Sequence, residues 1–148
     1  VGSLPAHYLL RTSWVIGDRH NFVRTMASLA DRAVSPEVVD DQFGRLTFTT
    51  EISRAIHHLL EADAPYGTYN LSNAGDRMTW ASIARAVFQA RGRDASSVRG
   101  VTTTEYGAGK SLAPRPRNSM LGLDKIIGSG FQPADAMTQL AAYLATVH

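Results

Sequence analysis

HYLLRTSWVI, residues 7–16, has the composition of a strand. It is nearly continuous in apolar character and rich in β-branched and aromatic side chains, which is typical of a buried strand in a parallel sheet. Residues 21–33 follow after a short break and carry apolar side chains at helical spacing. Asn21 is a suitable N-cap, because its side chain can accept a free backbone N–H. We therefore expect a strand followed directly by an amphipathic helix.

The same alternation continues along the chain. Further strands are expected at residues 37–40, 47–49, 67–72 and 98–103, and further helices at residues 52–60, 80–92 and 133–144. Thr49 or Thr50 is expected to cap the second helix, Thr79 the third, and Pro133 to begin the last. Strands that alternate with helices of this length indicate an α/β domain, and 148 residues suit one domain.

The composition excludes several classes of protein. With 15 basic and 13 acidic residues the formal net charge is only +2, too balanced for a nucleic-acid binder. No run of about 18 apolar residues predicts a membrane-spanning helix, and residues 1–10 lack the features of a signal peptide. Cysteine is absent, which excludes disulfides and thiolate metal sites. We expect a cytoplasmic protein with no nucleic-acid or membrane partner.

Two motifs have the letters of catalytic or nucleotide-binding signatures without their context. GAGKS, residues 107–111, has Thr104 where a P-loop needs its first glycine, and Leu112 where a dinucleotide-binding loop needs its third. Tyr106 and Lys110 have the Y-x-x-x-K spacing, but the glycine-rich segment between them is a poor helix. The five histidines lack metal-ligand spacing. We expect no catalytic, cofactor-binding or metal-binding residue in this chain.

Several segments, taken in order, carry a family resemblance. They are RTSWVIG (11–17) followed by NFVRTM (21–26), VVDDQFGRLTFT (38–49), GTYNLSN (67–73) and TTTEYGAGKSLAPRPRNSML (102–121). Together they resemble the dTDP-4-dehydrorhamnose reductase family, within the extended short-chain dehydrogenase/reductase superfamily. The family usually has Tyr where this chain has Ile16 and Pro where it has Leu46, which weakens the transfer of fine substrate specificity.

The resemblance implies a two-part enzyme. Residues 1–148 would be a single substrate-binding domain, the C-terminal portion of an extended short-chain dehydrogenase (Rossmann-type) fold with short parallel strands and flanking helices. The N-terminal Rossmann part, which carries the catalytic Tyr and Lys and binds NADPH or NADH, would be absent, so this chain alone would bind no cofactor and be inactive. The reaction implied is the reduction of dTDP-4-dehydrorhamnose, a dTDP-4-keto-6-deoxyhexose, to dTDP-L-rhamnose. The partners implied are the dTDP-sugar, the Rossmann part and, as an option, a second copy in a homodimer.

The candidate substrate ligands combine cations, amides and an aromatic ring, as a nucleotide-sugar requires. Arg115 lies between two prolines in a basic loop that is otherwise interpreted as solvated, and the resemblance favours it as a phosphate ligand. Arg45 is a second phosphate candidate or a solvated turn residue. Gln42 and Asn118 are amides suited to sugar or base contacts.

Two further candidates have a structural alternative. Asn21 is either a helix cap or a ligand at the start of its helix. Trp14, at the end of the first strand, is either a core residue or, as the resemblance favours, a sugar contact. Trp80 lies on a helix with a clear apolar stripe, and we assign it to packing.

Two other functions remain open at this stage. The chain could belong to another nucleotide-sugar enzyme of the superfamily, an epimerase or dehydratase. It could also be a non-catalytic binding or regulatory subunit of the same fold, because a fold does not determine a function.

Overall fold

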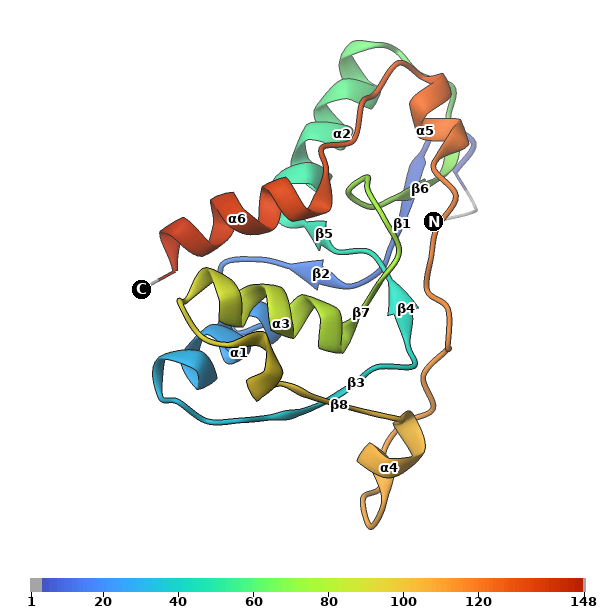
Figure 1. Ribbon diagram of the computed structural model, residues 1–148. Coiled ribbons are helices and arrows are strands. Elements are labelled where there is room, and N and C mark those ends of the chain that lie inside the picture. The colour runs from blue at the N-terminus through green and yellow to red at the C-terminus, as the bar shows by residue number, and fades with distance from the viewer. Residues whose placement is uncertain (1–3, 148) are drawn as a thin grey trace.

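Short strand pairs with helices packed around them form the fold in the computed structural model, which describes residues 4–147 (Figure 1). The described strands make three parallel pairs and one antiparallel pair. The parallel pairs are β1 (Tyr8–Thr12) with β6 (Gly67–Leu71), β2 (Val15–Ile16) with β5 (Thr47–Phe48), and β3 (Glu37–Val39) with β8 (Arg99–Val101). The antiparallel pair is β4 (Phe43–Gly44) with β7 (Met78–Thr79).

The helices are α1 (Phe22–Asp31), α2 (Thr49–Glu61), α3 (Trp80–Ala90), α4 (Thr103–Gly107), α5 (Asp124–Gly128) and α6 (Ala136–Thr146), with a 3-10 turn at Ala95–Ser97. This arrangement confirms the expected α/β class with short parallel strands and flanking helices. Two expected helix caps are also confirmed. The Asn21 side chain accepts a hydrogen bond from the Arg24 N–H, and Thr79 forms a reciprocal capping box with Ser82.

The first strand differs from its prediction. Residues 7–16 form two strands with different partners, because the chain turns at Trp14, whose φ of 49° lies in the left-handed region. β1 is not buried as expected: its residues are half-buried or exposed. The prediction was wrong because apolar character shows only that a strand could be buried. Among the described residues β1 pairs with β6 alone, so its other edge has no neighbouring strand.

Helix boundaries account for the other corrections. Neither Thr49 nor Thr50 caps α2, because its N-cap is Phe48 and no side chain caps it. The last helix begins at Ala136 and not at Pro133, since the carboxylate of Asp135 accepts the N–H groups of the first turn. The strand expected over residues 98–103 is limited to β8, because Thr102 instead caps α4. The sequence interpretation missed β4, β7, α4 and α5.

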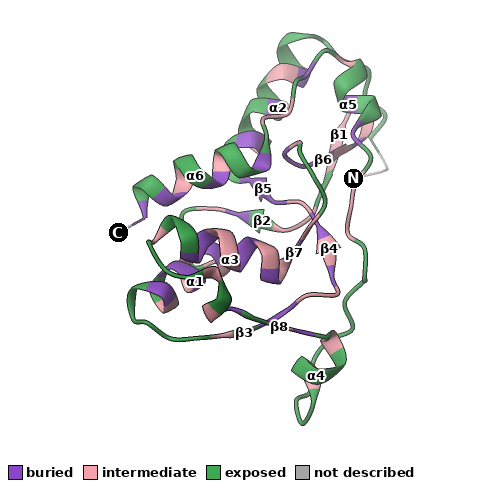
Figure 2. Cartoon of the chain, in the orientation of Figure 1, coloured by how far each residue is buried: buried purple, intermediate pink, exposed green. Residues whose placement is uncertain are grey.

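The buried side chains form two clusters. The larger lies among α1, α3, α6 and the β2–β5 pair, and includes Val23, Ile83 and Leu140. The smaller lies between α2, α5 and the β1–β6 pair, around Leu59 and Tyr69. α4 and the segment that follows it project from this body and are largely exposed (Figures 1 and 2). Within residues 4–147, no helix has the length and apolar character needed to cross a membrane.

Candidate functional site

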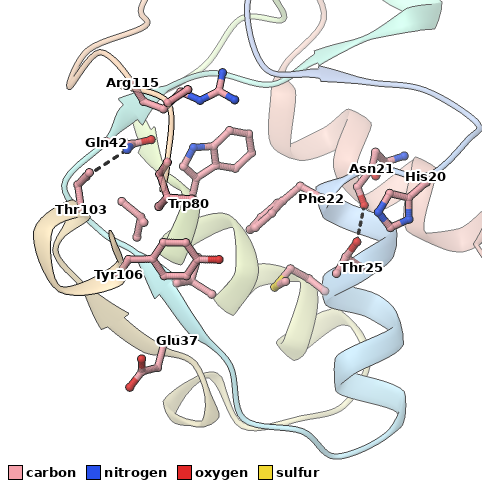
Figure 3. A pocket seen from close by; sticks show the side chains of 15 residues that line it. His20, Asn21, Phe22, Thr25, Glu37, Gln42, Trp80, Thr103, Tyr106 and Arg115 are labelled. Carbon is pink, nitrogen blue, oxygen red and sulfur yellow. Dashed lines mark hydrogen bonds between the residues drawn. The ribbon is translucent and has the colours of Figure 1, made fainter. Parts of the chain in front are cut away.

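Two adjoining cavities, of about 500 and about 660 Å³, form one cleft beside the larger core cluster. The residues that line both are His20, Asn21, Phe22, Gln42, Trp80 and Arg115. In Figure 3, Arg115, Gln42 and Thr103 lie along one wall, and His20, Asn21 and Thr25 lie along the other. The cleft is therefore built from the start of α1, the start of α3, the approach to β4 and the segment after α4.

Aromatic rings form a continuous surface in the cleft. The indoles of Trp14 and Trp80 are stacked, with centroids 3.9 Å apart and planes 20° apart. The ring of Phe22 meets Trp80 at 4.6 Å with a tilt of 59°. Trp14 lines the second cavity, as the sugar-contact interpretation requires, and also packs against the core.

The assignment of Trp80 to packing is confirmed, although packing is not the whole of its position. Its ring does pack against the core, but it also lines both cavities. The apolar stripe of α3 placed Trp80 correctly on the buried face. However, Trp80 is the first residue of that helix, and the first turn lies beside the cleft.

Asn21 performs the capping role. Besides accepting from Arg24, its amide nitrogen lies 2.7 Å from the Gly17 carbonyl, 2.9 Å from the Arg19 carbonyl and 2.8 Å from the Tyr143 hydroxyl. The structure therefore confirms the cap. A ligand contact by this side chain stays a prediction, since the residue also lines the cleft.

Gln42 is held at the cleft by the start of α4. Its side chain is only 8% exposed and donates from Nε2 to the Thr103 hydroxyl at 3.1 Å. Thr103 in turn donates its N–H and its hydroxyl to the carboxylate of Asp41, at 2.8 and 2.5 Å. The hydroxyl bond holds the pKa of Asp41 below its ordinary value. These contacts orient the Gln42 amide before any ligand arrives.

Arg115 is the cation of the cleft. It lines both cavities, and its exposed side chain makes no hydrogen bond or ion pair with any residue that the structure describes. A guanidinium in this setting can offer its whole donor fork to an anion. The neighbouring Arg117 does not line either cavity, and its carbonyl accepts the N–H of Phe43 at 2.8 Å.

Two predicted ligands lie outside the cleft. The guanidinium of Arg45 donates to the Leu121 carbonyl at 2.8 Å and to the Gly75 carbonyl at 3.3 Å, and burial lowers its pKa. Asn118 accepts the N–H of Met120 on its side-chain oxygen at 3.0 Å. The structure does not bring these two residues together with the others, and their ligand roles stay predictions.

The two residues with the Y-x-x-x-K spacing do not lie on one helix. α4 ends at Gly107, so Tyr106 and Lys110 do not share a helix, as expected. The Lys110 ammonium lies over the Tyr106 ring, 3.9 Å from its centroid. Tyr106 lines the first cavity together with Leu112, and the sequence interpretation gave neither of them a role there. The signal that could have found them is their place in the sequence, because Leu112 lies on the segment that carries Arg115 and Tyr106 lies in the helix just before it.

The side chains that line the cleft are suited to binding a ligand. It combines ring faces, an oriented amide and one unengaged guanidinium, which suits a ligand with flat, hydroxylated and anionic parts. No group of three or more His, Asp or Glu side chains able to hold a metal occurs among residues 4–147.

Comparison with known proteins identifies the family. The family model described as "RmlD substrate binding domain" matches residues 2–148. The spore coat polysaccharide biosynthesis protein SpsK of Bacillus subtilis (strain 168) is 36% identical over 137 residues, 92% of this chain and 46% of the relative. A dTDP-4-dehydrorhamnose reductase of Aggregatibacter actinomycetemcomitans is 33% identical over 154 residues, 94% of this chain and 51% of the relative.

Solved structures agree with this match. A dTDP-4-dehydrorhamnose reductase from Bacillus anthracis, in complex with NADP, has a TM-score of 0.80 and 29% identity over 93% of this chain and 47% of that one. Its counterpart from Clostridium acetobutylicum has a TM-score of 0.82 and 29% identity, over 93% and 48% of the two chains. The expected extended short-chain dehydrogenase fold is thus confirmed.

The chain spans about half the length of the curated relatives that it matches. The match of the family model extends over nearly every residue, and the segments that carried the resemblance lie within it. This chain therefore belongs to the RmlD substrate binding domain family.

Proposed function

We propose that this chain is the nucleotide-sugar-binding part of an NAD(P)H-dependent reductase that converts a dTDP-4-keto-6-deoxyhexose, dTDP-4-dehydrorhamnose, to dTDP-L-rhamnose. The observation that carries the proposal is the unengaged guanidinium of Arg115 in the same cleft as the stacked rings of Trp14 and Trp80. A diphosphate and a hexose joined in one ligand need a cation and a ring face close together. The family membership supports this substrate class.

Each ligand part has a candidate contact. Arg115 would bind the diphosphate through two donors of its guanidinium, with Pro114 and Pro116 restricting its loop beforehand. Trp14 would contact the hexose, and the Gln42 amide would contact a sugar or base group. Catalysis in this account depends on these residues holding the keto group in one position, since orientation alone can lower a barrier substantially.

The glycine-rich segment at residues 107–111 does not fit a dinucleotide cofactor. GAGKS leads into an exposed segment of residues 111–117 that is not helical, so it lacks the helix N-terminus that receives a pyrophosphate. We assign NADPH or NADH, together with the catalytic Tyr and Lys, to a Rossmann part of the same enzyme. A cytoplasmic location and a homodimer stay predictions.

A reductase is favoured over an epimerase or dehydratase. Curated relatives of this chain at 33–35% identity include dTDP-4-dehydrorhamnose reductases and a dTDP-4-keto-6-deoxy-D-glucose reductase of Streptomyces niveus. The likeness to epimerase structures is weaker: the UDP-glucose 4-epimerase of Thermus thermophilus is 15% identical with a TM-score of 0.68, which supports the fold alone.

The test is a turnover assay on the complete enzyme that contains this chain. A reductase oxidises one NAD(P)H for each dTDP-4-keto sugar consumed, whereas an epimerase has no net demand for reduced cofactor and a binding subunit gives no turnover. We expect stoichiometric oxidation by the complete enzyme and none above background by residues 1–148 alone. Turnover by the isolated chain, or an epimerised product without oxidation of the cofactor, would contradict the proposal.

A further inference from the structure

The backbone of Trp14 is fixed in a conformation that only a few non-glycine residues adopt. Its φ is 49°, and its carbonyl accepts the Thr47 N–H at 3.1 Å. The Thr47 hydroxyl donates to the carbonyl of Ser13 at 2.6 Å, and the Ser13 hydroxyl donates to Ser119 at 3.1 Å. These bonds hold both sides of the turn, so the direction in which the indole leaves the chain is determined by the fold.

The indole itself lies directly against Gly44. A Cβ atom added at Gly44 would lie 2.6, 2.8 and 2.9 Å from three atoms of the Trp14 ring, closer than real Cβ atoms approach a neighbour. The backbone of Gly44 cannot easily move away, because it pairs with Met78 in the β4–β7 ladder. Glycine is therefore required here by the close approach of a ring and not by the backbone conformation.

Trp80 supplies the second contact of the ring. It follows β7 directly and begins α3, whose start is fixed by the capping box between Thr79 and Ser82. Pairing of β4 with β7 thus brings Gly44 and Trp80 to the same indole. Gly44 leaves room for the Trp14 ring because it has no side chain, and Trp80 stacks on that ring.

We infer that Gly44 and Trp80 are positioning residues that fix the orientation of the Trp14 indole in the cleft and thereby determine the affinity for the sugar half of the ligand. The inference rests on the proposed function for the identity of the ligand. Strained turns and preset rings occur where a binding surface must be ready before the ligand arrives. A ring held in place on two contacts loses little freedom when a hexose packs against it.

The first experiment measures the orientation of the Trp14 indole relative to Trp80 in the absence of ligand. The chain has two tryptophans, Trp14 and Trp80, so an exciton couplet in its circular dichroism spectrum reports this stacked pair. Gly44→Ala should weaken or invert the couplet, because the new Cβ displaces the ring, and Trp80→Phe should abolish it. Gly128→Ala is the matched control: its Cβ would meet no atom within 4 Å and its φ is not in the left-handed region. A couplet that Gly44→Ala leaves unchanged would overturn the inference.

The second experiment compares titrations of dTDP and dTDP-glucose into the same variants. We expect Gly44→Ala to weaken the binding of dTDP-glucose about tenfold and that of dTDP less than about twofold, because only the sugar contact is misplaced. General damage to the fold would weaken both ligands equally, and equal losses would overturn the positioning role. If Gly44→Ala fails to fold, Trp80→Phe decides, with a loss in the same direction expected for dTDP-glucose only.

Failure of the proposed function gives a different result. In that case the unsubstituted chain binds neither dTDP nor dTDP-glucose, while the couplet still responds to Gly44→Ala. Unchanged affinity for dTDP-glucose in both Gly44→Ala and Trp80→Phe, with the couplet altered, would instead contradict the link between ring orientation and sugar binding.

Discussion

The carboxylate of Asp41 accepts both the N–H and the hydroxyl hydrogen bond of Thr103, at 2.8 and 2.5 Å. Thr103 is the first residue of α4, and its hydroxyl also accepts the amide of Gln42. Asp41 therefore joins the approach to β4 to the wall of the cleft that carries Tyr106.

Replacing Asp41 by Ala should loosen α4 and release Gln42. A hydrogen bond to a charged group contributes about 1.5–3 kcal/mol, so we expect the free energy of unfolding to fall by about 1–2 kcal/mol. The affinity for dTDP-glucose should fall several-fold, because the oriented amide is lost. Urea unfolding and calorimetric titration measure the two effects. Asp41→Asn, which keeps an acceptor oxygen, is the control, and equal losses in Asn and Ala would contradict this role.

Acid should remove the contribution of Asp41. The Thr103 hydroxyl bond lowers its pKa in the folded state below the unfolded value of about 4. The stabilisation is therefore complete at pH above about 4 and is lost as the pH falls through the folded pKa. Unfolding curves from about pH 6 to about pH 2 should show a shallower decline for Asp41→Asn than for the unsubstituted chain.

Other carboxylates titrate in the same range and set the background of that measurement. The pKa values of Glu105 and Asp135 are lowered by backbone N–H groups of Thr102 and Thr138, and that of Asp94 by Ser96. The shifts of Asp94 and Asp135 should remain in Asp41→Asn, whereas the pKa of Glu105 also loses the raising effect of the Asp41 charge. The difference between the two curves therefore reports Asp41 together with its effect on Glu105. Parallel curves of unfolding free energy against pH would show that the charge of Asp41 does not stabilise the folded protein.

Substitution of Arg45 distinguishes a structural role of this side chain from a role in ligand binding. Its guanidinium joins the carbonyls of Leu121 and Gly75, so we expect Arg45→Ala to lower the free energy of unfolding by about 1–3 kcal/mol. The affinity for dTDP should change less than about twofold. Thermal unfolding and titration of this variant separate the roles: unchanged stability with at least tenfold weaker dTDP binding would support the phosphate contact expected from the sequence.

The sequence predicted those features that depend on local pattern. Helical spacing identified α1, α2, α3 and α6, and the capping residues Asn21 and Thr79 follow from side-chain chemistry that acts within four residues. Arg115 was favoured by the family resemblance and Gln42 by the chemistry of its amide, and the structure brings both to one cleft.

What the sequence did not predict depends on contacts between distant residues. The break at Trp14 is held by Thr47 and Gly44, about 30 positions later, and no periodicity in residues 7–16 indicates it. Arg45 is next to a suitable loop in sequence, but the fold turns its guanidinium toward Leu121, away from the cleft. A two-residue strand such as β4 is too short to leave a pattern.

The affinity of dTDP-glucose for the unsubstituted chain and for Arg115→Ala and Arg115→Lys, measured by calorimetric titration, shows whether the cleft binds a nucleotide-sugar through Arg115. One charge-assisted contact to a diphosphate is worth about 1.5–3 kcal/mol, so Arg115→Ala should bind about ten- to a hundredfold more weakly. Arg115→Lys should recover only part of this loss, because an ammonium cannot reproduce the bidentate fork. The exposed side chain predicts a change in unfolding free energy below about 0.5 kcal/mol. Equal affinities in all three proteins would contradict the assignment of this cleft to a nucleotide-sugar.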